Sequence, residues 1–278
     1  MTGPWHVSLL STDGLNNAIG LQFAVGRRLG LGGQGAVFLA TPRAGRFVAQ
    51  DVALKIYSPD GSDERVDREI RALGQIRSPH LARALEHGSI NIAGRALRWV
   101  SWEFVQGQSL RERIDLHGAL SPVDVAALLR DVSRATQALW EKRIVHRDIK
   151  PANIIFDRTK GVWVLVDLGL ARFLNEPSIT QPGAWCGTPG YMSPEQAWAE
   201  HRLTVHSDVF ALGVTAAEAC TGTHPTGFAQ GGLMPPSPSA ATAVRSIPVL
   251  GDVLVAMLDH NPIARPVPEE ILDAVGGV

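Results

Sequence analysis

The strongest constraint on the fold of this chain is a change in pattern near residues 105–109. Upstream, between residues 21 and 56, short apolar segments alternate with glycine-rich or polar turns, which predicts antiparallel strands. Downstream, residues 121–144 place apolar side chains at helical spacing, with Ser121 as the predicted N-cap and Pro122 at the first helical position. We therefore predict a strand-rich first part and a larger, mainly helical second part, joined by one short segment.

Three further segments have the pattern of helices. Residues 65–76, RVDREIRALGQI, are amphipathic and interrupt the strands, whereas residues 208–222, DVFALGVTAAEACTG, are largely apolar and predict a buried helix that ends at Gly222. Residues 267–275 predict a short terminal helix. Between Gly222 and Pro248 the sequence is rich in glycine, proline and serine, so we expect a long surface loop there.

The composition excludes several classes of function. The 26 Lys and Arg residues nearly balance the 27 Asp and Glu residues, so we expect no nucleic-acid partner. No apolar run approaches the roughly 20 residues that span a bilayer, and the N-terminus has no secretion signal, so we expect no membrane contact. Cys186 and Cys220 are too far apart in the sequence for a metal-binding CxxC pattern, and two cysteines make no disulfide framework. These features predict a cytoplasmic protein.

A glycine-rich segment, from Leu29 to Val37, is the first candidate for a binding site. Because Gly30, Gly32 and Gly35 lack side chains, backbone N–H groups there could approach a polyphosphate closely. A glycine-rich hairpin turn would have the same pattern. A dinucleotide-binding turn would lead into a helix, and a Walker A loop would need Gly-Lys followed by Ser or Thr, whereas the GAVFLAT that follows here is strand-like.

A second candidate is Lys55, which ends the apolar strand Val52–Lys55, where a charge needs either solvent or a partner. In isolation, a surface lysine is the alternative interpretation. Glu69 on the predicted helix is the candidate partner, and Glu64 is the alternative. Such an ion pair would hold the ammonium group where it can contact the α- and β-phosphates of a nucleotide.

Two further motifs lie in the second part of the chain. Residues 146–153 are His-Arg-Asp-Ile-Lys-Pro-Ala-Asn, and residues 167–169, Asp-Leu-Gly, follow the apolar strand VWVLV. In the first part of the chain, a glycine-rich loop lies between two predicted strands, and Lys55 follows. Together with these features, the two motifs make the chain resemble a eukaryotic-type protein kinase of the bacterial Ser/Thr group. The resemblance extends from about Leu21 to the C-terminus.

The resemblance implies an α+β, bilobal protein-kinase-like fold. Residues 1–278 would form a single kinase domain. Residues 20–105 would be the small N-terminal lobe, an antiparallel β-sheet with one helix, and residues 106–278 the larger, mainly α-helical C-terminal lobe.

The resemblance also assigns a chemical role to each motif residue. Asp148 would accept or orient the proton of the substrate hydroxyl, and Lys150 would neutralise charge on the transferred γ-phosphoryl group. Asn153 and Asp167 would hold Mg²⁺, or Mn²⁺ in its place, and Lys55 would contact the phosphates of ATP. The residues implied to contact the nucleotide are Leu29, Gly30, Gly32, Gly35, Val37, Ala53, Lys55, Glu69, Glu103, Val105, Ile155 and Asp167.

Residues 102–105 resemble the family's hinge. Main-chain groups of Glu103 and Val105 would meet adenine, and Trp102 would be a bulky gatekeeper that narrows the pocket behind it. Simple core packing is the alternative for Trp102. For His146, packing is favoured over an acid or base role because the nearby aspartate already supplies that role.

The segment that ends in Gly187–Glu195, GTPGYMSPE, resembles the family's activation segment. Glu195 would pair with Arg265 to anchor it. Lys150 and Thr188 are features that resemble Ser/Thr kinases rather than Tyr kinases, so they indicate the acceptor hydroxyl.

Regulation by phosphorylation is a hypothesis that follows from the same resemblance. Arg147, next to the catalytic aspartate, would receive a phosphate group carried by Thr180 or Ser178, which would order the activation segment. Thr188 is a third candidate for the phosphorylated residue.

Two other functions compete with a protein kinase. A nucleotide-binding pseudokinase scaffold is the main alternative, but the intact motif residues argue against it. Leu168 replaces the family's usual Phe and keeps apolar bulk beside Asp167, so metal binding by Asp167 should survive the replacement. A small-molecule phosphotransferase is the second alternative, but it would lack a segment such as GTPGYMSPEQ. The presence of this segment argues for a peptide acceptor. The expected partners are protein substrates phosphorylated on Ser or Thr and a counteracting phosphatase, whereas the substrate's identity stays open.

Overall fold

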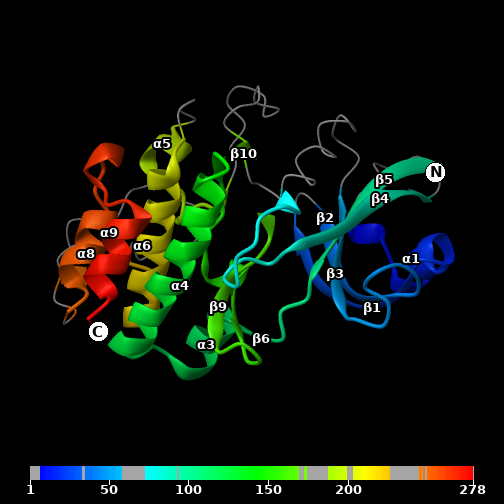
Figure 1. Ribbon diagram of the computed structural model, residues 1–278, viewed down its shortest axis with the longest axis horizontal. Helices are drawn as coiled ribbons and strands as arrows, with labels where there is room; N and C mark the ends of the chain where they lie inside the picture. Colours follow the sequence, from blue (N-terminus) through cyan, green and yellow to red (C-terminus); the bar gives the residue numbers. More distant parts are fainter. Residues whose placement is uncertain are drawn as a thin grey trace. The chain divides into compact units, whose positions relative to one another are not determined.

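The computed structural model divides the chain into two compact units (Figure 1). Unit 1 consists of residues 1–77 and 82–104, and unit 2 consists of residues 78–81 and 105–278. No helix among the described residues is both long enough and apolar enough to cross a membrane. The described residues are 7–32, 35–57, 73–92, 94–168, 172–173, 187–198, 203–225, 244–245, 247 and 249–277.

Unit 1 is built around one five-stranded antiparallel sheet with the strand order β1-β2-β3-β5-β4. This sheet confirms the antiparallel strands predicted at the start of the chain. Alternate residues of a strand point to opposite faces, so Phe38, Leu54 and Leu97 are fully buried on the face that forms the core. The elements are η1 Val7–Leu9, α1 Thr12–Ile19, β1 Phe23–Gly32, β2 Gly35–Pro42, β3 Val52–Tyr57, β4 Ala84–Ile92 and β5 Arg95–Glu103.

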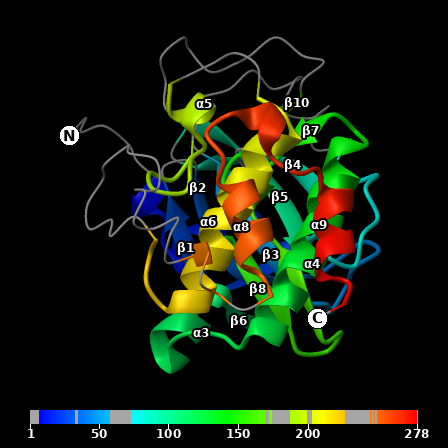
Figure 2. The same cartoon turned by 90° about the vertical axis from the view of Figure 1, so that its left-hand side faces the viewer.

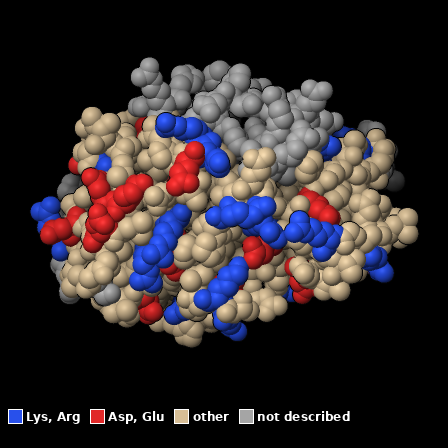
Figure 3. Space-filling view, in the orientation of Figure 1, with Lys and Arg blue, Asp and Glu red and all other residues tan. Residues whose placement is uncertain are grey.

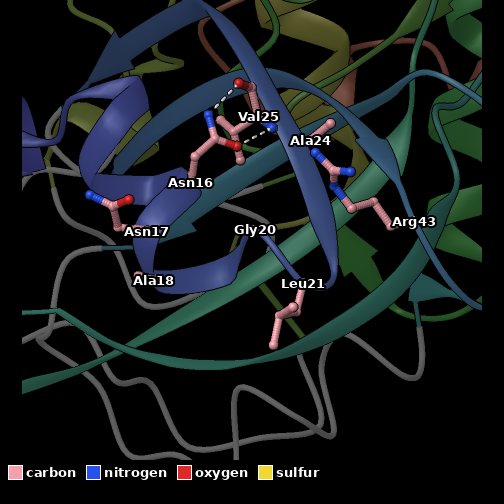
Figure 4. Close-up of a pocket in the computed structure, with 8 residues that line it drawn as sticks. All are labelled: Asn16, Asn17, Ala18, Gly20, Leu21, Ala24, Val25 and Arg43. Atoms are coloured by element: carbon pink, nitrogen blue, oxygen red, sulfur yellow. Dashed lines mark hydrogen bonds between the residues drawn. The ribbon is translucent and has the colours of Figure 1, made fainter.

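Helix α1 was not predicted from the sequence, although it covers part of this core. Its side chains Leu15 and Ile19 are buried, and the Asn16 side chain binds β1 through both main-chain groups of Val25, each at 2.9 Å (Figure 4). A depression of about 650 Å³ beside the helix is lined by residues that include Leu21, which is almost fully exposed. A helix of eight residues with two asparagines and a glycine has little intrinsic stability, so it depends on this packing.

The helix predicted at residues 65–76 falls largely outside the described residues. Leu73 and Ile76, near its predicted end, are buried at 6% and 5% exposure. Their burial agrees with the apolar face that the sequence places there.

Unit 2 is mainly helical (Figure 2). Helix α4 packs against α6 and α9, and α6 packs against α8, while two small antiparallel sheets, β6-β8-β9 and β10-β7, complete the unit. Unit 1 is a β-sheet and unit 2 is mainly helical, so the predicted α+β class is confirmed. The elements are β6 Gly107–Ser109, α3 Leu110–His117, α4 Pro122–Trp140, β7 Ile144–Val145, η2 Pro151–Asn153, β8 Ile154–Asp157, β9 Val162–Leu165, β10 Arg172–Phe173, α5 Pro194–Ala197, α6 Val205–Thr221, α8 Gly251–Met257, η4 Pro262–Ala264 and α9 Pro268–Val275.

Helix α4 begins where the sequence predicts and ends earlier. The Ser121 side chain accepts the N–H of Asp124 at 3.2 Å, and Pro122 occupies the first turn. The helix ends at Trp140 because Arg143 has a left-handed φ of 57°, which turns the chain into β7.

Helix α6 is buried on all sides, as its apolar sequence predicts. It begins at Val205, three residues before the predicted start, because the Thr204 hydroxyl accepts the N–H of His206. It ends at Gly222, whose φ of 74° is the left-handed conformation that glycine adopts without strain. Helix α9 also forms at its predicted position, whereas most of the predicted loop before Pro248 lies outside the described residues.

Residues 78–81 lie between the two sequence segments of unit 1, but they pack within unit 2. The His80 carbonyl accepts the N–H of Leu165 at 2.9 Å, and Leu81 forms a parallel bridge to the same residue. The His80 ring lies 3.6 Å from a carboxylate oxygen of Asp131 on α4, and both side chains are buried. This short loop is therefore an integral part of the core of unit 2.

Candidate active site

The sheet of unit 1 places three of the predicted nucleotide-contacting residues on the face opposite its apolar core. Val37 on β2 pairs directly with Lys55 on β3, and Ala53 lies two residues before Lys55. Because side chains alternate along a strand, these three share one face, while the intervening Phe38 and Leu54 point into the core. Strand pairing thus brings together residues that the sequence could only name separately.

The glycine segment forms the end of β1 and the beginning of β2, where Gly32 pairs with Gly35. Residues 33–34 lie outside the described part of the chain. Among the described residues, a Cβ atom added at Gly30 or Gly32 would meet no atom within 4 Å, whereas one added at Gly35 would lie 2.2 Å from the Ile56 carbonyl oxygen. Packing therefore requires Gly35, whereas no described atom crowds a side chain at Gly30 or Gly32.

Lys55 is buried near the end of β3, with 5% of the residue exposed. Its ammonium group lies 5.1 Å from the centre of the Tyr57 ring, which is a cation–π contact. The predicted partner Glu69 and the alternative Glu64 lie outside the described residues, so the ion pair stays a prediction. Leu29, the first residue of the glycine segment, is half-buried on β1.

The predicted hinge begins at the end of β5. Trp102 is buried and pairs with Ala53 on β3, and Glu103 donates its N–H to the Arg83 carbonyl oxygen at 2.8 Å. Val105, the first hinge residue in unit 2, is also buried. The contacts of these residues with a nucleotide stay predictions.

In unit 2, three side chains bind the carboxylate of Asp148. Lys150 Nζ donates to Oδ2 at 2.8 Å, Asn153 Nδ2 donates to the same oxygen at 3.0 Å, and the Thr188 hydroxyl donates to Oδ1 at 2.7 Å. Lys150 also donates to the Thr188 hydroxyl at 2.5 Å. Charge-assisted bonds of this kind fix the direction in which a carboxylate points. The sequence predicted Asp148, Lys150 and Asn153 as parts of one site. It did not predict that Thr188 would bind Asp148 there.

The loop that carries Asp148 is held by Asp208 on α6. The Asp208 carboxylate accepts the main-chain N–H of His146 at 2.8 Å and of Arg147 at 2.9 Å. Burial raises the pKa of Asp208, and these two N–H donors act in the opposite direction. Arg147 has a left-handed φ of 73°, an uncommon conformation for a residue with a side chain, so the two bonds hold a strained turn.

His146 packs as predicted. It is completely buried, its Nε2 lies 3.2 Å from the Val166 carbonyl oxygen, and its Nδ1 accepts the N–H of Asp148 at 3.3 Å. Both ring nitrogens therefore contact main-chain atoms of neighbouring segments.

Asp167 follows β9 and is exposed, with a left-handed φ of 63°. Leu168 beside it is buried at 4% exposure, so the residue that replaces the family's usual Phe is packed in the core. Ile155 on β8 is half-buried and pairs with Val164 on β9.

The predicted pair of Glu195 and Arg265 is confirmed. Two guanidinium nitrogens of Arg265 donate to the two carboxylate oxygens of Glu195, at 2.8 and 2.9 Å, and both side chains are buried. The Ser207 hydroxyl donates to the same carboxylate at 2.8 Å. Burial alone would raise the pKa of Glu195, but these hydrogen bonds together lower it.

A second network in unit 2 was not predicted. The carboxylate of Glu218 on α6 accepts hydrogen bonds from Arg111 on α3 and from the Tyr191 hydroxyl, each at 2.6 Å. The Tyr191 ring packs edge-on against His224 at 5.0 Å. Burial, and then the bond to Glu218, raise the pKa of Tyr191. No sequence signal marks this network, because its members lie far apart along the chain.

The proposed regulatory residues Thr180 and Ser178 lie outside the described residues, as do Gly169 and Cys186. Cys220 is half-buried on α6, and burial raises the pKa of its thiol to about 11. A thiol with a raised pKa is a poor nucleophile at neutral pH.

The donor atoms near Asp148 suit a hard cation. The Asn153 amide nitrogen is used in bonds to Asp148, which leaves its side-chain oxygen as an available ligand, and Asp167 offers an exposed carboxylate. Oxygen donors of this kind are those that Mg²⁺ prefers. In the part of the chain that the structure describes, no group of three or more His, Cys, Asp or Glu side chains could hold a metal ion.

Comparison with known proteins places this geometry in a family. The model of the protein kinase domain matches residues 23–274. The serine/threonine-protein kinase PknD of Mycobacterium tuberculosis is 32% identical over 252 residues, which cover 86% of this chain and 37% of PknD. The serine/threonine-protein kinase PknB of Mycobacterium leprae is 31% identical over 210 residues, which cover 73% of this chain and 33% of PknB. This chain thus spans about a third of the length of these relatives.

A solved structure shows the same fold. The kinase domain of Mycobacterium tuberculosis PknI superposes with a TM-score of 0.70 at 25% sequence identity, over 92% of this chain and 96% of that domain. The family model matches most of the chain, and the motif at residues 146–153 has the geometry described above. The chain therefore belongs to the protein kinase domain family.

Proposed function

We propose that this chain transfers the γ-phosphoryl group of ATP to Ser or Thr hydroxyls of protein substrates. One observation carries the proposal. The Thr188 hydroxyl donates a hydrogen bond to Asp148 Oδ1 at 2.7 Å, and the Lys150 ammonium donates hydrogen bonds to both residues. The Asp148 carboxylate already accepts a hydrogen bond from a threonine hydroxyl beside a lysine. It could therefore accept one from the Ser or Thr hydroxyl of a protein substrate.

Each residue of the loop would make a separate contribution to transfer. Asp148 would orient the acceptor hydroxyl and take up its proton, and Lys150 would stand beside the transferred group and offset its negative charge. Asn153 keeps the carboxylate aligned through its bond to Oδ2 at 3.0 Å. Because a protein kinase does little covalent chemistry itself, alignment of this kind supplies most of the rate enhancement.

Contacts with the nucleotide and the metal belong to the same proposal. The backbone of Gly30 and Gly32 would cover the phosphates, the Lys55 ammonium would contact two of them, and Asn153 and Asp167 would hold Mg²⁺ or Mn²⁺ through oxygen atoms. When bound, the metal ion would neutralise charge on the phosphates. We assign the remaining nucleotide contacts to Leu29, Gly35, Val37, Ala53, Glu69, Glu103, Val105 and Ile155.

Three finer assignments belong to the same proposal. Residues 1–278 would be one kinase domain with lobes at 20–105 and 106–278. The activation segment would be autophosphorylated on Thr180, Ser178 or Thr188, with Arg147 as the phosphate receptor. A phosphatase would reverse the modification of the substrate. The relatives PknD and PknB are named serine/threonine-protein kinases, which supports a Ser or Thr acceptor.

The test is transfer of labelled phosphate from γ-labelled ATP with Mg²⁺, with and without a generic basic protein substrate. Asp148→Asn and Lys55→Met should both abolish transfer, whereas the matched controls Asp273→Asn and Lys142→Met, at exposed positions, should not. Absence of transfer by the intact protein, despite measurable binding of Mg·ATP, would favour a nucleotide-binding scaffold instead.

A further inference from the structure

A basic pocket lies in unit 1, and none of the residues assigned to ATP or to transfer lines it. It has a volume of about 360 Å³ and is formed by three segments: the loop between β2 and β3, residues 74–77, and residues 83–87, which lead into β4. Each segment contributes one arginine. The lining residues are Arg46, Phe47, Gly74, Gln75, Arg77, Arg83, Ala84, Leu85, Glu86 and His87.

The three arginines are held in place by contacts within the pocket. The guanidinium groups of Arg83 and Arg46 lie 5.5 and 6.0 Å from the centre of the Phe47 ring. Arg77 donates to the carbonyl oxygens of Gly74 and, at 3.1 Å, of Ile76. Contacts of this kind restrict the side chains before any ligand arrives, so less conformational entropy is lost on binding.

The charge of the pocket is not neutralised by the described part of the protein. Among the described residues, no carboxylate forms a salt bridge with Arg46, Arg77 or Arg83. Glu86 is the one acidic residue among those that line the pocket, against three arginines. An anion in the pocket would therefore meet a local excess of positive charge.

The kind of anion follows from the geometry of the donors. A guanidinium group presents a planar fork of N–H donors that matches the oxygens of a phosphate, and arginine clusters are a common means of recognising phosphorylated peptides. A nucleic acid would need a more extended basic surface. The face drawn in Figure 3 instead has acidic side chains among the basic ones, and the whole chain carries a net charge of −1.

We propose that the pocket formed by Arg46, Arg77 and Arg83 binds the phosphate group of a phosphorylated Ser or Thr side chain in a protein. The pocket is larger than one phosphate group, so neighbouring peptide atoms can enter it and contact Phe47 and Leu85. This inference does not depend on the proposed catalytic activity, because none of the residues assigned to that activity lines the pocket.

The probe is an Ala-Ala-pSer-Ala-Ala peptide, with the unphosphorylated peptide, inorganic phosphate and sulfate as comparisons. The whole chain is first treated with a phosphatase, which is then removed, so that its own phosphate groups do not compete. Binding is followed by the NMR shifts of the arginine side-chain N–H groups and by calorimetry. We expect saturable binding of the phosphopeptide that shifts the three arginine signals and weakens as salt is raised.

Variants separate this site from general attraction to a positively charged surface. Arg83→Gln and Arg46→Gln should each weaken phosphopeptide binding about ten-fold. Arg83→Lys should weaken it less, because lysine keeps the positive charge although it lacks the planar fork of guanidinium N–H donors. The matched control is Arg43→Gln. Arg43 is an exposed arginine in the same loop as Arg46, but it does not line the pocket, so this variant should bind as the wild type does.

Four outcomes would overturn the proposal. They are equal binding of the phosphorylated and unphosphorylated peptides, equal binding of inorganic phosphate or sulfate, unchanged binding by the arginine variants, and a stable dimer in solution in which the pocket is covered by a second copy. Each outcome is independent of phosphate transfer, so a failure here leaves the kinase assay unaffected.

Discussion

Arg265 places two guanidinium nitrogens on the two carboxylate oxygens of Glu195, 70 residues away in the sequence, in an almost completely buried pair. The remaining Arg265 donors bind the carbonyl oxygens of Asp259, His206 and His260. The anchor of the predicted activation segment is thus tied to the loop before α9 and to the start of α6. Because every donor is used, either residue left alone would be a buried charge without its partner.

The first prediction concerns this pair. Arg265→Met should lower the free energy of unfolding by about 3–5 kcal/mol, because Glu195 is left charged and buried. Denaturant titration measures the change. Glu195→Gln combined with Arg265→Met should be less destabilising than Arg265→Met alone, and a double variant that is worse would contradict this account.

The same pair predicts a dependence on pH. The pKa of Glu195 is lower in the folded protein than its usual value, so its contribution to stability is present above the unfolded pKa and is lost as pH falls through the folded pKa. The free energy of unfolding of Glu195→Gln should therefore fall less steeply with acidification than that of the wild type. Parallel curves would show that Glu195 does not titrate in this way.

The glycine segment offers a test that separates fold from binding. Gly35→Ala should destabilise the protein by about 1–3 kcal/mol, because its Cβ would lie 2.2 Å from the Ile56 carbonyl oxygen. Among the described residues, no atom lies within 4 Å of a Cβ added at Gly30 or Gly32, so Gly30→Ala and Gly32→Ala should unfold as the wild type does but bind ATP about ten-fold more weakly. Thermal unfolding and nucleotide titration measure the two effects. Unchanged ATP affinity in both the Gly30 and the Gly32 variant would remove these glycines from the phosphate site.

Thr188 should be needed for its hydroxyl group. Thr188→Val removes the bonds to Asp148 and Lys150, and the resulting misalignment should lower kcat about a hundred-fold with little change in the KM for ATP. Thr188→Ser keeps the hydroxyl and should restore most of the rate. Steady-state kinetics decide between the two, and equal rates for the Val and Ser variants would make the bond irrelevant to transfer.

Tyr191 and Arg111 should be energetically coupled through Glu218. Tyr191→Phe should cost about 1–3 kcal/mol of stability, because the buried Glu218 carboxylate loses a hydrogen bond of 2.6 Å. In a double-mutant cycle with Arg111→Met, the two changes should deviate from additivity by about 0.5–3 kcal/mol. Additive effects would mean that the two residues act on separate parts of the structure.

The sequence predicted much of this protein from local patterns. The antiparallel strands, the caps at Ser121 and Gly222, and the helical character of the second part all depend on residues close together in the chain. The resemblance of the motif at 146–153 to protein kinases was enough to predict the family, which the match of the protein kinase domain to residues 23–274 confirms. It also led to the pair of Glu195 and Arg265, which the structure confirms.

Other features could not be predicted because they depend on contacts between distant segments. Helix α1 has a weak intrinsic tendency to form and is stabilised by packing of Leu15 and Ile19 and by the bonds of Asn16 to β1. The end of α4 at Trp140 is decided by the turn into β7, against a helical pattern that continues in the sequence.

The sequence by itself determined which residue types are present, where strands and helices can form, and which motifs the chain shares with protein kinases. The tertiary structure decided which side chains meet. Asp208 on α6 binds the loop that carries Asp148, and Thr188 binds Asp148 from a segment 40 residues later. Periodicity in a sequence reports only the face on which a residue lies, whereas a hydrogen bond between distant residues requires the packed core that brings their elements together.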